Sequence, residues 1–367
     1  MNQSPALFAF NRGIVSALGL ARTDQKRVAL SAETMNNFVS RVLGSMSFRP
    51  GLAYLGTTAS NAAARFLKFV FATSDTALIE LTNLAMRIWI SDALLSRSTV
   101  TTAVTNGTFN GNITGWTDSS DSGGAIAYEA TGKLKLTSNG TARAVASQEV
   151  TVSGANISVE HALYIIINRG PVTLRVGSTL GDDDYVTETN LDTGYHSIAF
   201  TPTGNFFIFF ASKTVYKKLV SNCTVQGSGT VSLTTIWPAA ALSTVRYDQS
   251  GDIIYIACDG YRPQKIERRG THPGGRSWSV CDYQVDDGPF MTENTGPITM
   301  TATAVTGDTT LTASKPYFRS THVGGLFKLT HPGQTQTSTI AAQNTFTTSI
   351  KVTGTEALRS FGISLTG

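Results

Sequence analysis

The chain has 367 residues, of which 15% are charged, and a formal net charge of +4. An average domain carries roughly 25% charged residues; here Thr, Ser, Gly and Asn replace them, which favours short strands and many turns. The length allows two or three domains with cores, the apolar content excludes a disordered chain, and no apolar run reaches the roughly 18 residues of a membrane span.

Residues 1–56 are an irregular, basic lead-in. We predict one short helix from Ser31 to Leu43, with Ser31 as the N-cap residue and Gly44 as the C-terminal stop. Its apolar side chains would share one face at helical spacing: Met35, Phe38, Val39 and Val42. The chain then turns at Arg49-Pro50-Gly51.

Two stretches far apart in the sequence share one pattern of strand, turn, strand, turn, strand. The first covers residues 65–91 and the second residues 245–268. In the second, Ser250-Gly251-Asp252 and Asp259-Gly260 predict turns around a buried strand, and Pro263 predicts an edge strand or a late strand start. Units of this kind form propeller blades or related sheets, so we expect a split, propeller-like platform with an insertion between its halves.

The insertion, residues 104–224, predicts an antiparallel sandwich. It begins with Asn106-Gly107-Thr108-Phe109 and Gly115-Trp116, which is similar to the start of a carbohydrate-binding-module-like jelly roll with its tryptophan in the core. The predicted strands are 134–136, 144–152, 157–167, 172–176, 195–200, 206–211 and 216–220. The continuously apolar run Phe206 to Phe210 predicts a strand buried on both faces.

The predicted fold is therefore mainly β, with four regions. They are a basic lead-in and first platform region (1–103), the inserted jelly-roll module (104–224), a second blade-like region (225–295) and a C-terminal β region (296–367). In the last region we expect a hairpin of 298–305 with 309–313 and further strands at 346–352 and 363–366. Either a small domain closes there or the sequence is the front part of a longer polypeptide.

We find no catalytic motif and expect a protein that is not an enzyme and needs no cofactor. The five histidines lack metal spacing, and the three cysteines, without a Cys-x-x-Cys pair, predict buried or half-buried free thiols. Asp182, Asp183 and Asp184 predict a solvated loop tip; the alternative is a calcium-binding loop, because hard cations prefer clustered carboxylates.

Two further sets of side chains are candidates for binding. Tyr128, Tyr164 and Tyr185 are candidates for stacking on a sugar ring. Basic residues are candidates for a channel or ring interface: Arg49, Arg262, Lys265, Arg268 and Arg269. They would either lie on solvated faces with inter-subunit salt bridges, or contact nucleic acid or an acidic partner ring. Aromatic residues are not interleaved with them, which argues against sequence-specific binding.

A series of short motifs in residues 10–97 and 244–294 resembles the tail-tube nozzle family of short-tailed bacteriophages. The early motifs are Gly13-Ile14-Val15-Ser16, Leu20-Ala21-Arg22-x-Asp24, Asn36-Asn37-Phe38, Gly44 and Arg49-Pro50-Gly51. The later ones are Tyr247-x-Gln249-Ser250-Gly251-Asp252, Arg262-Pro263-Gln264-Lys265-Ile266-x-Arg268, Trp278, Asp287-Gly288-Pro289-Phe290 and Asn294. Two departures stand out: members of that family are usually much longer, and the inserted module is not part of their shared core.

The resemblance implies a structural subunit of a homo-hexameric tail nozzle in the virion, made in the host cytoplasm. It would dock to the portal-adaptor ring, contact tail fibres or other tail proteins, and surround the DNA exit channel with non-specific passage of double-stranded DNA. The alternative is a carbohydrate-binding or host-adhesion tail protein that acts through the jelly-roll module on a glycan. A glycan-degrading enzyme would need a pair of carboxylates in a cleft, and the sequence nominates none.

Overall fold

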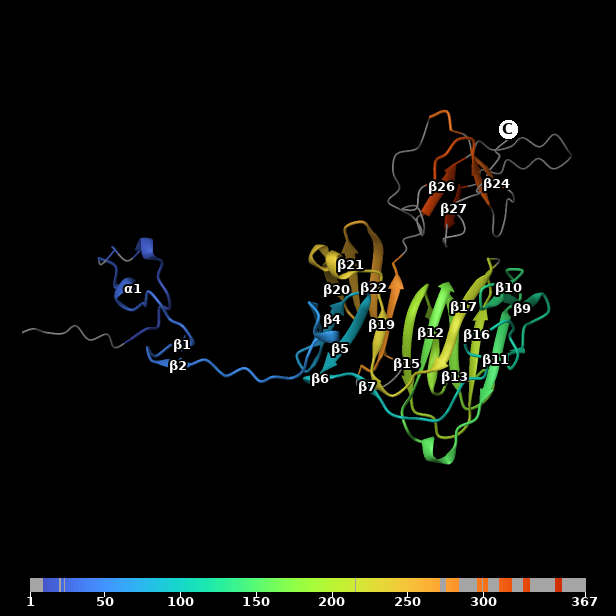
Figure 1. The fold of residues 1–367 in the computed structure, drawn as a ribbon, viewed down its shortest axis with the longest axis horizontal. Coiled ribbons are helices and arrows are strands. Elements are labelled where there is room, and N and C mark those ends of the chain that lie inside the picture. Colours follow the sequence, from blue (N-terminus) through green and yellow to red (C-terminus); the bar gives the residue numbers. More distant parts are fainter. Residues whose placement is uncertain are drawn as a thin grey trace, which may run out of the picture. The chain divides into compact units, whose positions relative to one another are not determined.

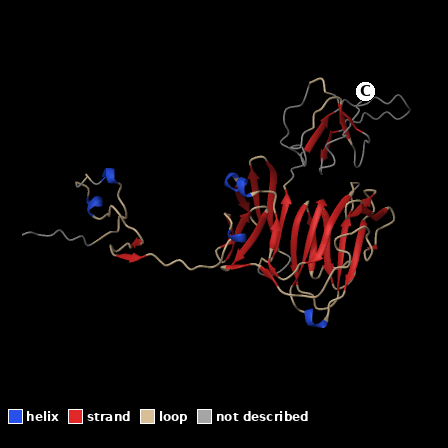
Figure 2. Cartoon of the chain, in the orientation of Figure 1, coloured by secondary structure: helices blue, strands red, loops and turns tan. Residues whose placement is uncertain are grey.

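The computed structural model describes residues 9–19, 21–22, 24–214, 216–270, 275–283, 296–298, 300–302, 310–318, 326–330 and 347–351. The chain divides into two compact units, Met1–Gly56 and Thr57–Gly367, called here the N-terminal and the main unit. Strands dominate the described residues, and the pairings between the named strands are antiparallel (Figures 1 and 2). The predicted mainly β fold is confirmed.

The N-terminal unit contains little regular structure. Its elements are η1 (Ala17–Gly19), α1 (Lys26–Ala29) and the hairpin of β1 (Phe38–Ser40) with β2 (Met46–Phe48). The prediction of a helix from Ser31 to Leu43 is wrong. The Ser31 hydroxyl donates back to the Arg27 carbonyl at 2.6 Å, and Asn37 adopts a left-handed φ of 63°, which an α-helix does not accept. Phe38 instead stacks on Phe48, 4.6 Å between ring centroids.

The first predicted strand unit forms a sheet of its own in the main unit. Its three meander strands are β3 (Arg65–Ala72), β4 (Asp75–Thr82) and β5 (Ala85–Ile90), as the sequence predicts. Two short strands extend it, since β6 (Ala93–Leu94) and β19 (Ser232–Thr234) both pair with β5. A separate two-stranded sheet pairs β7 (Ser96–Arg97) with β18 (Gly229–Thr230). The short 3-10 helices η2 (Ala59–Asn61) and η4 (Ala239–Thr244) flank these strands in the sequence.

The second predicted strand unit is a four-stranded meander. It consists of β20 (Arg246–Ser250), β21 (Ile253–Cys258), β22 (Tyr261–Arg269) and β23 (Ser277–Asp282). The expectation of an edge strand at Pro263 is wrong, because β22 lies between β21 and β23. Pro263 is the third residue of that strand and sits beside a register shift between Ile256 and Cys258, which tolerates its missing N–H.

The two meanders pack face to face around one hydrophobic core, and we call this pair of sheets sandwich B. Phe69 of β3 meets Trp278 of β23 edge to face, with 5.2 Å between ring centroids. The Gln249 side-chain amide joins the two edges, since it accepts from the Val70 N–H and donates to the Val70 carbonyl, both at 3.0 Å. The propeller-like arrangement stays a prediction.

The predicted insertion folds as a two-sheet sandwich, called sandwich A. One sheet has the order β14 (Val186–Leu191), β13 (Val172–Gly177), β16 (Phe206–Ser212), β11 (Ala144–Val150), β8 (Thr117–Asp118). The facing strands are β9 (Gly124–Glu129), β10 (Lys133–Ser138), β17 (Lys218–Val225), β12 (His161–Arg169) and β15 (Gly194–Phe200), and η3 (Gly154–Asn156) precedes β12. Trp116 is buried beside Phe109 and Phe210, which confirms its predicted core position.

One continuous nine-stranded sheet serves both sandwiches. Its order is β20-β21-β22-β23-β15-β12-β17-β10-β9, so β15 of sandwich A pairs directly with β23 of sandwich B (Figure 1). Gly194 starts β15 at this joint, and a Cβ there would lie 2.2 Å from the Val280 carbonyl oxygen. The core of sandwich A draws on residues 109–220 and 223, whereas that of sandwich B draws on 67–95 and 231–280. Two cores thus share one layer.

Two hairpins follow towards the C-terminus. They are β24 (Met300–Ala302) with β25 (Leu311–Ala313), and β26 (Leu326–Thr330) with β27 (Thr347–Lys351). The predicted hairpin strands and the strand at 346–352 agree with these pairs. The predicted strand 363–366 and the motifs Asp287-Gly288-Pro289-Phe290 and Asn294 lie outside the described residues.

Candidate functional site

The described part of the N-terminal unit buries no apolar side chain. Only Ser31 and Gly44 are buried among its described residues. Its exposed large apolar residues are Ile14, Leu18, Phe38, Val39, Val42, Leu43, Phe48, Leu52, Tyr54 and Leu55. Leu43 is 98% exposed and Val42 is 91% exposed. Because a buried side chain of this size contributes about 1.5–3 kcal/mol, the unit carries a large, unused capacity for association.

The same unit carries the entire net charge of the chain. Residues 1–56 hold six of the 29 Lys and Arg residues but only two of the 25 Asp and Glu residues. The remaining 23 basic and 23 acidic residues cancel in the main unit. Arg49, one of the interface candidates, is exposed and donates to the Asn37 side-chain oxygen at 2.9 Å. An apolar and positively charged surface is thereby concentrated in one short segment.

The other predicted interface candidates do not form a free basic patch. Arg268 pairs with Asp75 at 2.5 Å and Asp252 at 2.7 Å, and its guanidinium stacks on Phe69 and Phe71. Desolvation lowers the pKa of Arg268, but the hydrogen bonds from its two carboxylate partners outweigh this and raise it. Arg268 therefore joins the two sheets of sandwich B.

Lys265, Arg269 and Arg262 also have intrachain partners. Lys265 reaches Asp192 at 2.9 Å, and Arg269 donates to the Asn190 carbonyl at 2.9 Å, so both side chains on β22 contact the end of β14 in sandwich A. Arg262 pairs with Asp282 and keeps 39% of its side chain exposed. Of this cluster, Arg262 retains the largest exposed surface.

The joint between the sandwiches also contains a buried ion-pair network. Arg97 is buried and donates to Glu160 at 3.0 Å and to the Ser197 hydroxyl at 2.7 Å, while Arg276 forms a second pair with Glu160. Burial raises the pKa of Glu160, but the hydrogen bonds and charges of Arg276 and Arg97 hold it below its usual range. This carboxylate is a structural ion-pair partner.

Another carboxylate, the fully buried Glu80, is held in the same way. It accepts from Arg87, from the Trp89 indole at 2.8 Å and from the Ala59 N–H at 2.8 Å. Burial raises its pKa, and the donated hydrogen bonds more than offset this, so the pKa lies below its usual range. Neither Glu80 nor Glu160 has the raised pKa expected of a general acid.

The three candidate sugar-stacking tyrosines lie apart. Tyr164 packs against the core of sandwich B, and Tyr185 packs against the core of sandwich A with its hydroxyl 2.8 Å from that of Thr203. Tyr128 lies on β9 and its hydroxyl accepts from the Gly132 N–H at 3.3 Å. They do not line one surface.

The aspartates of the predicted loop tip each hold the loop in place. Asp182 accepts from the Thr179 hydroxyl, Asp183 from the Glu188 N–H at 2.8 Å and Asp184 from the Ser178 N–H at 2.7 Å. No group of three or more metal-ligating side chains is found among the described residues, these aspartates included. The solvated-loop interpretation fits these contacts better than the calcium alternative.

The cysteines and histidines in the described chain are structural. Cys223, Cys258 and Cys281 are free and buried, as predicted, and burial raises the pKa of the Cys281 thiol to about 12, which leaves it unreactive. His196 is fully buried between the Ser279 hydroxyl at 2.8 Å and the Asp192 carbonyl at 3.0 Å. Desolvation holds its pKa well below the usual histidine value, so it stays neutral.

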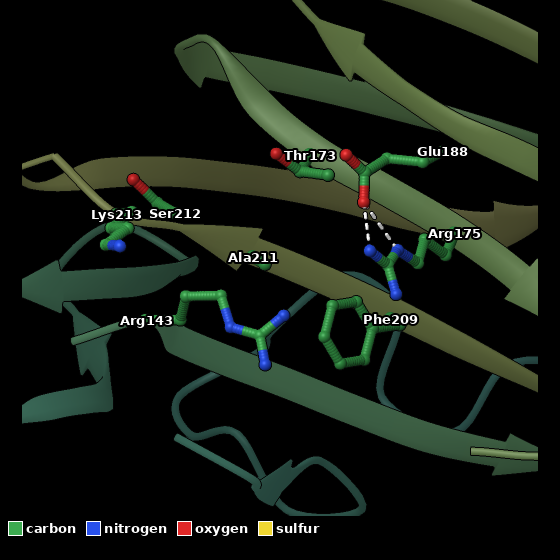
Figure 3. A pocket seen from close by; sticks show the side chains of 8 residues that line it. All are labelled: Arg143, Thr173, Arg175, Glu188, Phe209, Ala211, Ser212 and Lys213. Carbon is green, nitrogen blue, oxygen red and sulfur yellow. Dashed lines mark hydrogen bonds and ion pairs between the residues drawn. The ribbon is translucent and has the colours of Figure 1, made fainter. Parts of the chain in front are cut away.

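Sequence reasoning missed one groove, on the outer face of the five-stranded sheet of sandwich A. It has a volume of about 230 Å³. The lining residues are Arg143, Thr173, Arg175, Glu188, Phe209, Ala211, Ser212 and Lys213. Figure 3 shows the guanidinium groups of Arg143 and Arg175 beside the Phe209 ring, with Glu188 behind Arg175. The alternation of side chains along a strand predicts that some of these residues share one face of a sheet. It does not predict which strands are neighbours in that sheet.

In comparisons with known proteins, no protein-family model and no curated protein matches the chain. None of its described helices has the length and apolar character to cross a membrane. Two surfaces of the described chain are candidates for function: the exposed apolar side chains of the N-terminal unit and the groove of sandwich A.

Proposed function

We propose that this chain is a non-enzymatic structural subunit that assembles into a ring, as in the nozzle of a phage tail. The observation that carries the proposal is the N-terminal unit, in which ten large apolar side chains are exposed and whose described residues include no buried apolar side chain. A surface of this kind is typical of a segment that becomes ordered against another chain. The partner in the proposal is a further copy of this chain.

The positive charge of the same unit supports a second contact. Six basic residues against two acidic ones would complement a negatively charged partner surface, such as the portal-adaptor ring implied by the resemblance. Tail fibres or other tail proteins would bind elsewhere on the assembled ring. In this proposal the protein resides in the tail of the virion.

The ion pairs of sandwich B fit a channel that passes DNA without holding it. Each phosphate neutralised by a free Lys or Arg adds affinity for DNA. Lys265, Arg268 and Arg269 are already paired with acidic side chains of the chain itself. If β22 faced the lumen, most of its cationic side chains would be unavailable to grip the phosphate backbone.

The test is the mass of the full chain in solution, measured by light scattering over a range of concentrations. We expect a hexamer that the double variant Val42→Asp and Leu43→Asp converts to smaller species. Both side chains are almost fully exposed, so the substitutions should leave the main unit folded. A matched control, Leu180→Asp on an exposed loop of sandwich A, should keep the hexamer. A wild-type chain that stays monomeric at every concentration would contradict the proposal.

A second candidate function, carbohydrate binding through sandwich A, is supported by one observation. The groove on β13 and β16 combines cationic, hydroxyl and aromatic side chains. The tyrosines that the sequence nominates are absent from its lining. Carbohydrate binding would therefore use side chains different from those predicted.

A further inference from the structure

The groove of sandwich A is built from side chains that alternate outwards along neighbouring strands. Thr173 and Arg175 of β13 pair in register with Ala211 and Phe209 of β16, and all four line the groove. Their inward neighbours, such as Leu174, belong to the core. The groove floor is thus fixed by the sheet itself, and a ligand would meet a preformed surface.

Three cations meet one carboxylate in this groove. Arg143, Arg175 and Lys213 line it together with Glu188. At neutral pH the lining therefore carries a formal charge of +2. On a chain whose main unit has no net charge, this concentration of positive charge on one small surface favours an anionic ligand.

Arg175 is held in place before any ligand arrives. Its Nε donates to Glu188 at 2.7 Å, its Nη1 donates to the Gly181 carbonyl at 3.0 Å, and its guanidinium lies 5.6 Å from the centroid of the Phe209 ring. A guanidinium fixed by an ion pair and an aromatic face loses little conformational entropy on binding. Arg175 is the organised part of the site.

Arg143 and Lys213 form weaker or fewer interactions with the rest of the chain than Arg175 does. The closest carboxylate to the Arg143 guanidinium is Asp121, at 3.4 Å from Nε with both side chains about half exposed, which is a weak pair. Lys213 forms no salt bridge within the part of the chain that the structure describes. These two cations can therefore turn towards a ligand at little cost.

The rest of the lining indicates which anion fits. Thr173 and Ser212 provide hydroxyl groups and Glu188 provides a carboxylate acceptor. Phe209 and Ala211, which are 7% and 4% exposed, add a small apolar area to the floor. A sugar ring presents hydroxyl groups on its rim and C–H groups on its face, so it matches this mixture. The volume of about 230 Å³ lies below that of sites for drug-sized ligands, roughly 300–1,000 Å³, and suits a small ring.

We propose that this groove binds an acidic saccharide, with the sugar carboxylate at Arg143, Arg175 and Lys213 and the ring beside the small exposed part of Phe209. Inorganic phosphate fits less well, because its higher charge would be repelled by Glu188 more strongly than a single carboxylate would be, and because it has no C–H face to place beside Phe209. The inference deepens the second candidate function and does not depend on ring assembly, since all the lining residues belong to one chain.

The probe is a trisaccharide of galacturonic acid, titrated calorimetrically into the full-length protein. A neutral galactose trisaccharide and inorganic phosphate are titrated in parallel. We expect saturable binding of the uronate alone. Its affinity should fall as salt is raised from about 0.05 M to about 0.5 M, because partly exposed charges are screened.

The decisive variant is Arg143→Gln with Lys213→Gln. Both side chains lie at the surface, and we expect at least a tenfold loss of affinity for the uronate, as for the loss of two charge-assisted hydrogen bonds. The matched control, Lys68→Gln with Arg246→Gln, removes the same charge from exposed residues outside the groove and should bind like the wild type.

Four results would overturn the proposal: no saturable uronate binding, equal binding of the neutral sugar, phosphate binding as tight as that of the uronate, or a double variant that binds like the wild type. Light scattering on the same samples keeps this question separate from assembly. A hexamer that does not bind the uronate would refute the acidic-sugar site and leave the ring proposal intact.

Discussion

Arg268 illustrates how a basic cluster in a sequence becomes part of a fold. The side chain is 11% exposed, lies between two phenylalanine rings and bridges Asp75 and Asp252, which are 177 positions apart in the sequence. Arg262, six residues earlier, is 39% exposed and has one ion-pair partner. The cluster Arg262 to Arg269 was visible in the sequence, but its acidic partners lie too far along the chain to be assigned from spacing.

Substitution of these two arginines should separate a structural role from a surface role. We expect Arg268→Gln to lower the free energy of unfolding by about 1–3 kcal/mol, because it loses two ion pairs and two cation–π contacts. Arg262→Gln should cost less than Arg268→Gln, because Arg262 is 39% exposed and its buried partner Asp282 also accepts a hydrogen bond from Gln264. Urea denaturation of both variants measures the difference; equal losses would show that Arg268 does not hold sandwich B together.

His196 gives the fold a specific dependence on pH. Its folded-state pKa lies well below the usual histidine value of about 6.5, so the unfolded chain binds a proton that the folded chain excludes. Stability should therefore be full above about pH 6.5 and fall by up to about 1.4 kcal/mol per pH unit below it.

The check is urea denaturation between pH 7.5 and 5.5 of the wild type and of His196→Asn. The variant retains a polar side chain near Ser279 but cannot titrate, so its stability should change less steeply over this range. His161, whose pKa desolvation also lowers, remains in both proteins and sets the residual slope. Identical slopes would contradict the assignment to His196.

At the scale of elements, the pairing of β15 with β23 turns two sandwiches into one body. Gly194 permits the close approach, since a Cβ there would meet the Val280 carbonyl oxygen at 2.2 Å. We expect Gly194→Ala to destabilise the main unit by at least about 2 kcal/mol, as other clashes in packed interiors do, and to speed hydrogen exchange in β23.

The matched control for this joint is Gly204→Ala, where an added Cβ would meet nothing within 4 Å. The free energy of unfolding of this control should stay within about 0.5 kcal/mol of the wild-type value. Its hydrogen-exchange rates should equal those of the wild type within experimental error. If Gly194→Ala behaved like this control, the pairing of β15 with β23 would not be as close as described.

The strands most visible in the sequence were those with β-branched and aromatic residues. The runs that became β11, β12, β13, β15, β16 and β17 were all predicted, because their side chains fill the core of sandwich A. β9 (Gly124–Glu129) and β14 (Val186–Leu191) were missed, since the first is rich in Gly and Ala and the second mostly polar. The joint of β15 with β23 was also missed, because pairing across more than 80 residues leaves no periodic signal.

The N-terminal unit shows the limit of periodicity as a guide. Met35, Phe38, Val39 and Val42 have helical spacing, yet a hairpin forms there. An apolar stripe stabilises a helix only when it packs against a hydrophobic core. The described residues of this unit form no such core. Local preferences therefore decide the outcome, with the left-handed Asn37 ahead of β1 and Gly44 in the hairpin loop.

At the scale of the whole molecule, burial and charge are distributed unequally. The described part of the main unit has two large hydrophobic cores, and the unit has no net charge. Residues 1–56 carry the full net charge of +4, and ten large apolar side chains among their described residues are exposed. A chain of this kind is equipped to fold through its main unit and to associate through its N-terminal unit. In the ring that we propose, this association would take the form of six copies around a channel.

Electron microscopy of the purified full-length protein tests the proposed six-membered ring most directly, because class averages show both the symmetry and any central opening. We predict rings with six-fold symmetry and a central hole, and their loss in the variant with Val42→Asp and Leu43→Asp. Single particles of one chain, in a protein that is folded by spectroscopy, would contradict the ring proposal.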